Sequence, residues 1–173
     1  MVDDGKPILL VEDDPNDQLL IRRAFAKAKL MNPLRLTKDG DEAVNYLTGD
    51  GAFADREANP LPALVMLDLK LPRRSGLEVL EWLRSQAGSL GRTPVVVLTS
   101  SRENRDVDRA YELGANSYLV KPVKEERLGQ IYRRAQEILA LVEDLTRRIA
   151  GRGRAEQLHH RERGDRLART GFA

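Results

Sequence analysis

The stretch PILLVEDDP (7–15) decides the fold that this sequence predicts. Its apolar run is short and continuous, and acidic residues follow it directly. Continuous apolar runs of this length are typical of strands that are buried on both faces of a parallel sheet. Similar runs occur at 64–67 (LVML) and 95–98 (VVVL), with weaker candidates at 34–37 (LRLT) and 117–120 (SYLV). The sequence therefore predicts a sheet of five parallel strands.

Segments with helical spacing lie between these strands. Asp14-Pro15 is a typical helix start, because a capping residue precedes a first-turn proline. The spacing of apolar residues indicates helices at 15–30, 41–47, 77–84 and 103–113, and a last helix that begins near Lys124. Five β-α repeats predict a doubly wound α/β fold with helices on both faces of the sheet. Residues 48–62 have no periodicity, so we expect a surface excursion there.

The composition indicates an ordinary globular protein. The chain has 173 residues, 41% hydrophobic and 32% charged, so we expect one domain with an extension too short for an attached output module. It has no cysteine, which excludes a disulfide scaffold, a cysteine-based zinc site and thiol catalysis. The apolar run near the N-terminus is too short for a signal peptide or a membrane span. We therefore expect a cytoplasmic protein that does not contact a membrane.

The net charge of +2 hides an asymmetry along the chain. Residues 146–173 contain eight arginines and three acidic residues, which gives +5. Residues 1–145 contain 21 basic and 24 acidic residues, which gives −3. The acidic body and the basic tail therefore need separate explanations.

Polar side chains follow four of the five predicted strands. Ligands of open parallel α/β sheets bind beyond the carboxyl ends of the strands, near the point where the strand order reverses. With the order 2-1-3-4-5, strands one and three are neighbours there, and their acids lie on one side of a pocket with a hydroxyl and an ammonium on the other. The groups at these strand ends are Glu12-Asp13-Asp14, Asp68, Thr99-Ser100 and Lys121-Pro122.

This set of groups predicts chemistry on a phosphate. Clustered carboxylates repel one another unless a cation lies among them, and an ion of Mg²⁺ size prefers such oxygen ligands. Lys121 and Thr99 supply a charge and a hydroxyl for phosphate oxygens. A carboxylate can attack phosphorus to form an acyl phosphate, and Asp68 at the end of the central strand is the candidate nucleophile. We assign Asp14 to helix capping rather than to the site.

Four motifs resemble the receiver domain of two-component response regulators, and the resemblance covers residues 6–139. They are ILLVEDD (8–14), MLDLKLPRRSGLEVL (66–80), VVVLTSS (95–101) and GANSYLVKPV (114–123). The resemblance implies a flavodoxin-like fold, a cis Lys121-Pro122 bond, and a phosphoryl group that a histidine kinase donates in the presence of Mg²⁺. It further implies the following roles: Asp68 is the phosphoacceptor, Glu12, Asp13, Asp68 and the carbonyl of Lys70 bind the metal, Thr99 and Lys121 bind the phosphoryl group, and Tyr118 is the switch aromatic.

A finer pattern resembles the phytochrome-associated single-domain response regulators. It combines the long segment before the third strand with DLKLPRRSG (68–76) and LGANSYLVKPV (113–123). This implies that the kinase is a bacteriophytochrome. The sequence departs from that subgroup at Lys70, where Asn is usual. A lysine there could pair with the site's acids when the metal is absent, and we hypothesise an atypical lifetime of the phosphorylated Asp68.

The last helix carries an apolar heptad pattern, and over 124–150 it would be ~40 Å long, more than a five-stranded sheet can cover. Either its end frays, or the uncovered apolar residues contact a second copy or a partner, and we favour a homodimer. These residues are Leu141, Val142, Leu145 and Ile149. We therefore divide the chain into a receiver domain (1–139), a helix extension (140–150) and a basic flexible tail (151–173).

Three functions compete at this point. The first is a phosphorylation-switched signalling protein whose output is a protein contact. The second is a DNA-binding transcriptional regulator that uses the arginine-rich tail, but the tail is too short for a helix-turn-helix module, so we expect no specific nucleic acid partner. The third is an aspartyl-phosphate phosphatase, which needs a second acid where this chain has Lys70. We therefore expect no multiple-turnover activity.

Overall fold

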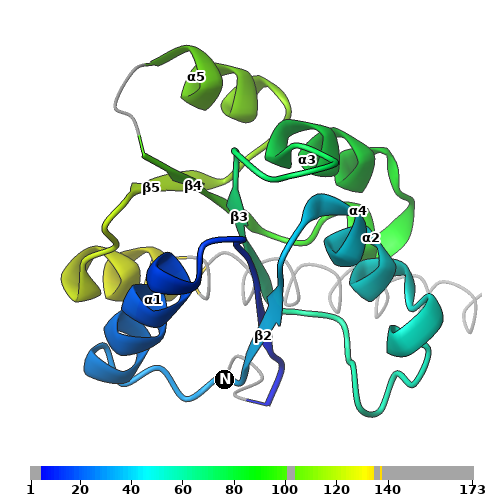
Figure 1. Cartoon of the computed structure of the whole chain (residues 1–173), viewed down its shortest axis with the longest axis horizontal. Helices are drawn as coiled ribbons and strands as arrows, with labels where there is room; N and C mark the ends of the chain where they lie inside the picture. The colour runs from blue at the N-terminus through cyan, green and yellow to red at the C-terminus, as the bar shows by residue number, and fades with distance from the viewer. Residues whose placement is uncertain (1–4, 101–103, 135–136, 138–173) are drawn as a thin grey trace, which may run out of the picture. The chain divides into compact units, whose positions relative to one another are not determined.

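A computed structural model gives the structure of residues 5–100, 104–134 and 137, and strands and helices alternate along it (Figure 1). The strands are β1 (Ile8–Val11), β2 (Leu34–Thr37), β3 (Leu64–Asp68), β4 (Val95–Thr99) and β5 (Ser117–Val120). The helices are α1 (Pro15–Lys27), α2 (Gly40–Thr48), the short 3-10 helix η1 (Gly51–Phe53), α3 (Gly76–Ser85), α4 (Gly88–Gly91) and α5 (Asn104–Glu112). Residues 125–134 are also helical.

Within the described residues, the strands form one parallel sheet in the order β2-β1-β3-β4-β5, which confirms the predicted doubly wound fold. Every residue of β1, β3 and β4 is buried, whereas the edge strands β2 and β5 are partly exposed. Burial on both faces explains why the central strands are so uniformly apolar. The register pairs Val11 with Leu67 and Asp68 with Leu98, so the carboxyl ends of the central strands lie side by side.

Helices cover both faces of the sheet, because successive strand residues point to opposite faces. Figure 1 shows α1 and the helical residues 125–134 on one face and α2 and α3 on the other. On the first face, Leu10 and Met66 pack with Ile21 and Phe25 of α1 and with Leu128. On the second face, strand residues pack with α2, α3 and α5; the buried members include Leu9, Val65, Val97, Leu47, Leu80, Leu83 and Ala110.

The start of α1 agrees with the sequence prediction, and its end does not. The side chain of Asp14 accepts hydrogen bonds from the backbone amides of Asn16 at 2.7 Å and Asp17 at 3.3 Å, so it caps the helix as predicted. The helix ends at Lys27, three residues earlier than expected. Lys29 has a φ of 55°, a left-handed backbone conformation that cannot continue an α-helix.

The excursion at 48–62 is more ordered than its lack of periodicity predicts. It contains η1, and the guanidinium of Arg56 donates hydrogen bonds to the carbonyls of Tyr46 at 2.7 Å and Leu47 at 2.6 Å. The hydroxyl of Tyr46 in turn donates to the carbonyl of Pro60 at 2.9 Å. The Arg56 bonds satisfy carbonyls at the end of α2 and the Tyr46 bond reaches the far side of the segment, so the segment is held against the domain. The short helix α4 was not predicted, because four residues carry no periodic signal.

The helix that follows β5 is described only in part. Leu128 is buried against the sheet, and the hydroxyl of Tyr132 donates a hydrogen bond to Asn32. The predicted contact residues Leu141, Val142, Leu145 and Ile149 lie outside the described residues, as does the tail at 151–173. Among the described residues, none of the helices is long and apolar enough to cross a membrane.

Candidate functional site

Three carboxylates gather at the carboxyl ends of β1 and β3. Ligand oxygens of Glu12, Asp13 and Asp68 all lie within 4.8 Å of one another. The two strands are neighbours, and their register places the residues that follow Val11 beside the end of β3. Glu12 and Asp68 are buried, whereas Asp13 is exposed. The predicted strand order thus brings together acids that are more than 50 residues apart in the sequence.

Lys121 is the cation of this site. Its Nζ lies 2.7 Å from Oε2 of Glu12 and 2.9 Å from Oδ2 of Asp17, and it also forms an ion pair with Asp68. The side chain of Lys121 is only 9% exposed. Burial alone lowers the pKa of Lys121, but the hydrogen bonds with Asp68, Glu12 and Asp17 outweigh burial and raise it above its ordinary value. The side chain is therefore an ammonium ion throughout the physiological pH range.

Glu12 shows the opposite balance for a carboxyl group. Burial raises the pKa of Glu12, and the hydrogen bonds from Lys121 and from the backbone amide of Asp14 offset this only in part. The nearby charge of Asp68 raises the pKa further. The site thus holds more negative charge than one ammonium ion balances.

The backbone fixes the position of Asp68. The amide of Lys70 donates a hydrogen bond to Oδ1 of Asp68 at 2.9 Å, while Oδ2 faces Lys121. The loop after β3 passes close to the strand end, since a Cβ atom at Gly76 would lie 2.1 Å from the carbonyl oxygen of Asp68. Only glycine fits at position 76 without moving this backbone.

Arginines tie the loop after β3 to α2. Arg73 forms an ion pair with Asp39, the buried residue that caps α2, and Nε of Arg74 lies 3.1 Å from Oδ1 of Asp41. Burial alone raises the pKa of Asp39, but the hydrogen bonds from the Glu42 amide and from Arg73 lower it below its ordinary value. The loop that carries Lys70 is therefore anchored at a second point, through α2.

The remaining predicted residues lie at the end of β4, within β5 and directly after β5. Thr99 is buried at the end of β4, and its carbonyl accepts a hydrogen bond from the backbone amide of Lys121 at 2.8 Å. The Lys121-Pro122 peptide bond is cis, as expected. Tyr118 is 36% exposed, and its ring meets the ring of Tyr111 edge-on, with the centroids 6.2 Å apart.

Lys70 does not pair with the acids in the way that we considered from the sequence. Its side chain is exposed, and in the described part of the chain Lys121 is the residue that forms ion pairs with Glu12 and Asp68. Lys121 follows β5 directly and lies within ion-pair distance of both acids, whereas Lys70 contacts Asp68 through its backbone amide and its side chain is exposed.

Sequence reasoning missed Asp17. This residue is in the first turn of α1, where an acidic side chain is usually explained by the helix dipole. Its contact with Lys121 joins residues that are 104 positions apart in the sequence. The only signal in the sequence was its spacing of three residues from the cap Asp14, which places it at the same end of the sheet as the site.

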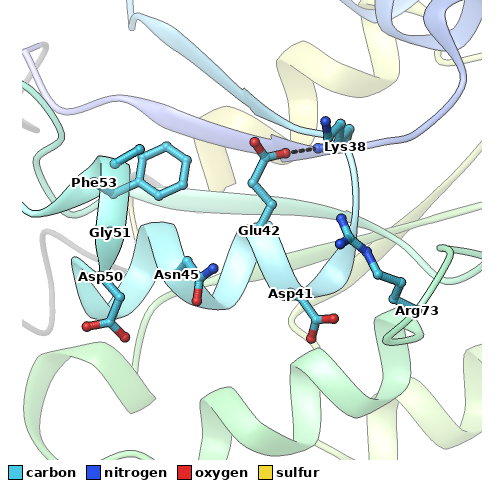
Figure 2. Close-up of a pocket in the computed structure, with 9 residues that line it drawn as sticks. Lys38, Asp41, Glu42, Asn45, Asp50, Gly51, Phe53 and Arg73 are labelled. Carbon is cyan, nitrogen blue, oxygen red and sulfur yellow. Dashed lines mark hydrogen bonds between the residues drawn. The ribbon is translucent and has the colours of Figure 1, made fainter.

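A separate hollow of about 320 Å³ lies beside α2 and η1. Figure 2 shows Phe53 at one end of it and Arg73 at the other, with Glu42 between them and directed toward Lys38. Its lining mixes acidic and basic side chains and contains none of the residues that the sequence predicted for the site. We therefore place the candidate site at the acidic cluster and not in this hollow.

The acidic cluster has the composition of a site for a hard divalent cation. All of its side-chain donors are carboxylate oxygens, which ions such as Mg²⁺ and Mn²⁺ prefer. Two of the three carboxylates are buried beside each other, which is costly without a compensating charge. In this structure Lys121 supplies part of that charge, and a cation at the exposed Asp13 side would supply the rest.

Comparison with known proteins gives a consistent result. Residues 8–133 match the model of the family described as the response regulator receiver domain. The chain is 40% identical over 124 residues to "Response regulator Rcp1" from Synechocystis sp., a match that covers 70% of this chain and 82% of that protein.

Solved structures of similar sequence share the fold. The bacteriophytochrome response regulator RtBRR is 48% identical with a TM-score of 0.66, over 72% of this chain and 74% of that one. The phosphorylated cyanobacterial phytochrome response regulator RcpA is 36% identical with a TM-score of 0.63, over 78% and 91%. The Mn²⁺-bound form of Rcp1 is 37% identical with a TM-score of 0.62, also over 78% and 91%.

Proposed function

Because the chain belongs to the response regulator receiver domain family, we propose that it is a single-domain response regulator that accepts a phosphoryl group on Asp68. The position of Asp68 carries the proposal. Its Oδ1 accepts a hydrogen bond from the Lys70 amide at 2.9 Å, its Oδ2 faces Lys121, and the carboxylates of Glu12 and Asp13 are adjacent. A relative whose structure is described as phosphorylated, RcpA, supports the same chemistry.

The proposed reaction is a phosphoryl transfer from a phosphohistidine. A carboxylate oxygen of Asp68 attacks the phosphorus, the O–P bond forms as the N–P bond breaks, and the bonding electron pair leaves with the histidine nitrogen. Lys121 turns an N–H from Asp68 to a phosphoryl oxygen, and the hydroxyl of Thr99 donates to another. Because Lys121 stays an ammonium ion, it can donate a hydrogen bond to a phosphoryl oxygen during the transfer.

We propose Mg²⁺ as the cofactor. The carboxylates of Glu12, Asp13 and Asp68 and the carbonyl of Lys70 would hold it, and the bound ion supplies positive charge to the phosphoryl oxygens. The oxygen-only cluster supports this assignment, as does the Mn²⁺-bound form of the relative Rcp1. In the metal-free protein, Lys121 balances part of the same negative charge.

The proposed output is a change at the surface formed by α5, β5 and the helical residues 125–134. Thr99 and Lys121 would move toward the phosphoryl group, and this would shift the ends of β4 and β5. Tyr118 lies on β5, so the shift would reach it. Its ring already contacts Tyr111 of α5, so a change of its rotamer would be transmitted to that helix. Tyr118 is therefore the proposed switch residue.

We propose a histidine kinase as the partner, with a bacteriophytochrome as the candidate that the names of RtBRR and RcpA suggest. The protein would act as a phosphoryl acceptor without multiple turnover, because Lys70 occupies the position where aspartyl-phosphate phosphatases need a second acid. Homodimerisation through Leu141, Val142, Leu145 and Ile149 remains a prediction, as does the division at 139 and 150.

One experiment tests this function. The full chain is incubated with Mg²⁺ and acetyl phosphate, and phosphoryl incorporation and mass in solution are measured for the wild type and for Asp68→Asn. We expect incorporation into the wild type alone. An Asp68→Asn protein that incorporates as much as the wild type, or a wild type that incorporates none, would contradict the proposal. A change of mass on incorporation would extend it to the predicted homodimer.

A further inference from the structure

The contact between Asp17 and Lys121 has no role in the reaction described so far. An ammonium ion has three N–H donors. In the described part of the chain, Lys121 meets three carboxylates: Glu12 Oε2 at 2.7 Å, Asp17 Oδ2 at 2.9 Å, and Asp68 Oδ2. The ammonium ion therefore has as many carboxylate neighbours as it has donors.

These three partners differ in what else they must do. Glu12 and Asp68 belong to the acidic cluster, and Asp68 is also the proposed phosphoacceptor. Asp17 is not a member of that cluster, and its side chain is 29% exposed on α1. A cation and a phosphoryl group at the site would compete with Lys121 for Glu12 and Asp68. Asp17 would then be the carboxylate that Lys121 retains.

The first turn of α1 holds Asp17 firmly. Its backbone amide donates to Oδ1 of Asp14 at 3.3 Å, and Nε2 of the next residue, Gln18, donates to the carbonyl of Glu12 at 2.7 Å. The backbone of Lys121 is fixed separately by its amide bond to the Thr99 carbonyl at 2.8 Å. The lysine side chain therefore extends from a fixed point toward a fixed carboxylate.

We propose that Asp17 is a positioning residue for phosphoryl transfer. It keeps the Lys121 ammonium at the edge of the site while Glu12 and Asp68 give up their contacts with Lys121. The inference rests on the proposed function. Without Asp17, the ammonium lies deeper between Glu12 and Asp68 before the reaction, and has no anchor outside the cluster afterwards. The transfer then starts from a lysine that is less well placed for a phosphoryl oxygen.

The test uses the full chain with Asp17→Asn, Asp17→Glu and the matched control Asp14→Asn. The control removes one charge from the same helix end and keeps a good N-cap, because asparagine caps as well as aspartate. At saturating Mg²⁺ and acetyl phosphate, we expect Asp17→Asn to slow incorporation about fivefold, which corresponds to about 1 kcal/mol. Asp14→Asn should match the wild type, and Asp17→Glu should recover part of the rate.

A second measurement needs no phosphorylation. The ¹⁵N and ¹H signals of the Lys121 ammonium group report its hydrogen exchange in the metal-free protein, and Asp17→Asn should speed that exchange while Asp14→Asn does not. Equal rates and equal exchange in Asp17→Asn and wild type would overturn the inference. So would slower transfer with an unchanged ammonium signal, because the effect would then not pass through Lys121. A wild type that incorporates no phosphoryl group would refute the proposed function instead, and the ammonium signal would still decide whether Asp17 holds Lys121.

Discussion

The two ends of the sheet each hold a partly buried cation, and they hold it by different means. At the carboxyl end, Lys121 is surrounded by the carboxylates of Glu12, Asp17 and Asp68. At the amino end, Arg84 of α3 donates to the backbone carbonyls of Gly91, Thr93 and Gly114, at 2.9 to 3.0 Å. Burial lowers the pKa of Arg84, whereas the carboxylates raise that of Lys121 in spite of burial.

This difference separates a switch from a permanent connection. Carboxylates are charged partners that a metal ion or a phosphoryl group can compete for, so the position of Lys121 depends on the state of the site. The carbonyls around Arg84 are neutral and belong to the end of α4 and to the segments before β4 and β5, at the opposite end of the sheet from the acidic site. We therefore expect Arg84 to keep these contacts when the acidic site is occupied.

The largest expected effect is at Lys121. Lys121→Met leaves Glu12 and Asp68 buried without their cation, so we expect a loss of about 3 kcal/mol of unfolding free energy at neutral pH in metal-free buffer. Added Mg²⁺ should restore part of it. Urea unfolding with and without Mg²⁺ measures the loss of unfolding free energy and its partial recovery. The control is Lys124→Met, an exposed lysine close by, which should unfold like the wild type.

Arg84→Met should have the second largest effect, a loss of about 2 kcal/mol of unfolding free energy, because several carbonyls lose a charged donor. Mg²⁺ should not restore this loss, and phosphoryl incorporation by the folded protein should stay at the wild-type rate. Arg84→Lys should rescue little, since one ammonium cannot reach carbonyls on both loops. The exposed Arg92→Met serves as the control. Rescue of Arg84→Met by Mg²⁺ would erase the contrast between the two ends.

A smaller, pH-dependent effect is expected at Glu12. Its folded-state pKa is raised, so the wild type gains stability from protonation of Glu12 below its ordinary pKa of 4.5 and loses that gain as the pH rises through the folded value. Glu12→Gln removes this dependence. The difference in unfolding free energy between Glu12→Gln and the wild type should therefore move in favour of the variant as the pH rises from 4.5 to 7. If the unfolding free energies of Glu12→Gln and the wild type changed in parallel over this range, Lys121 would fully offset the effect of burial on Glu12.

The smallest expected effect concerns Lys70. Its exposed ammonium is carried two residues after Asp68 and adds positive charge near the site, so we expect Lys70→Asn to speed the loss of the phosphoryl group about threefold, within the range of an exposed ion pair. The decay of phosphorylated protein after removal of the donor measures this. Lys29→Asn is the matched control, because asparagine tolerates the left-handed conformation at that position. An unchanged lifetime of the phosphorylated protein in Lys70→Asn would mean that the Lys70 side chain does not affect the phosphoryl group, and that Lys121 is the lysine that matters at this end of the sheet.

The sheet could be predicted because each strand is marked by a short run of residues in the sequence. Uniform apolar runs such as 8–11 and 95–98 have one reasonable place, a strand covered on both faces. The rule that parallel strands meet at their carboxyl ends predicted that Glu12, Asp13, Asp68 and Lys121 lie close together, as they do in the structure. The helix end at Lys27 and the short helix α4 were not found, since end positions depend on one or two backbone angles and not on a pattern.

The sequence by itself predicted the five strands and the polar residues that follow them, because hydrophobic periodicity is a local property. The family resemblance supplied the strand order 2-1-3-4-5. Only the tertiary structure decided that Lys121 pairs with Asp17, that the Lys70 side chain is exposed, and that Arg84 donates to three backbone carbonyls before β4 and β5. These contacts join residues up to 104 positions apart. The partners of long flexible side chains depend on which groups the folded backbone brings close to them. A local sequence pattern therefore does not predict these contacts.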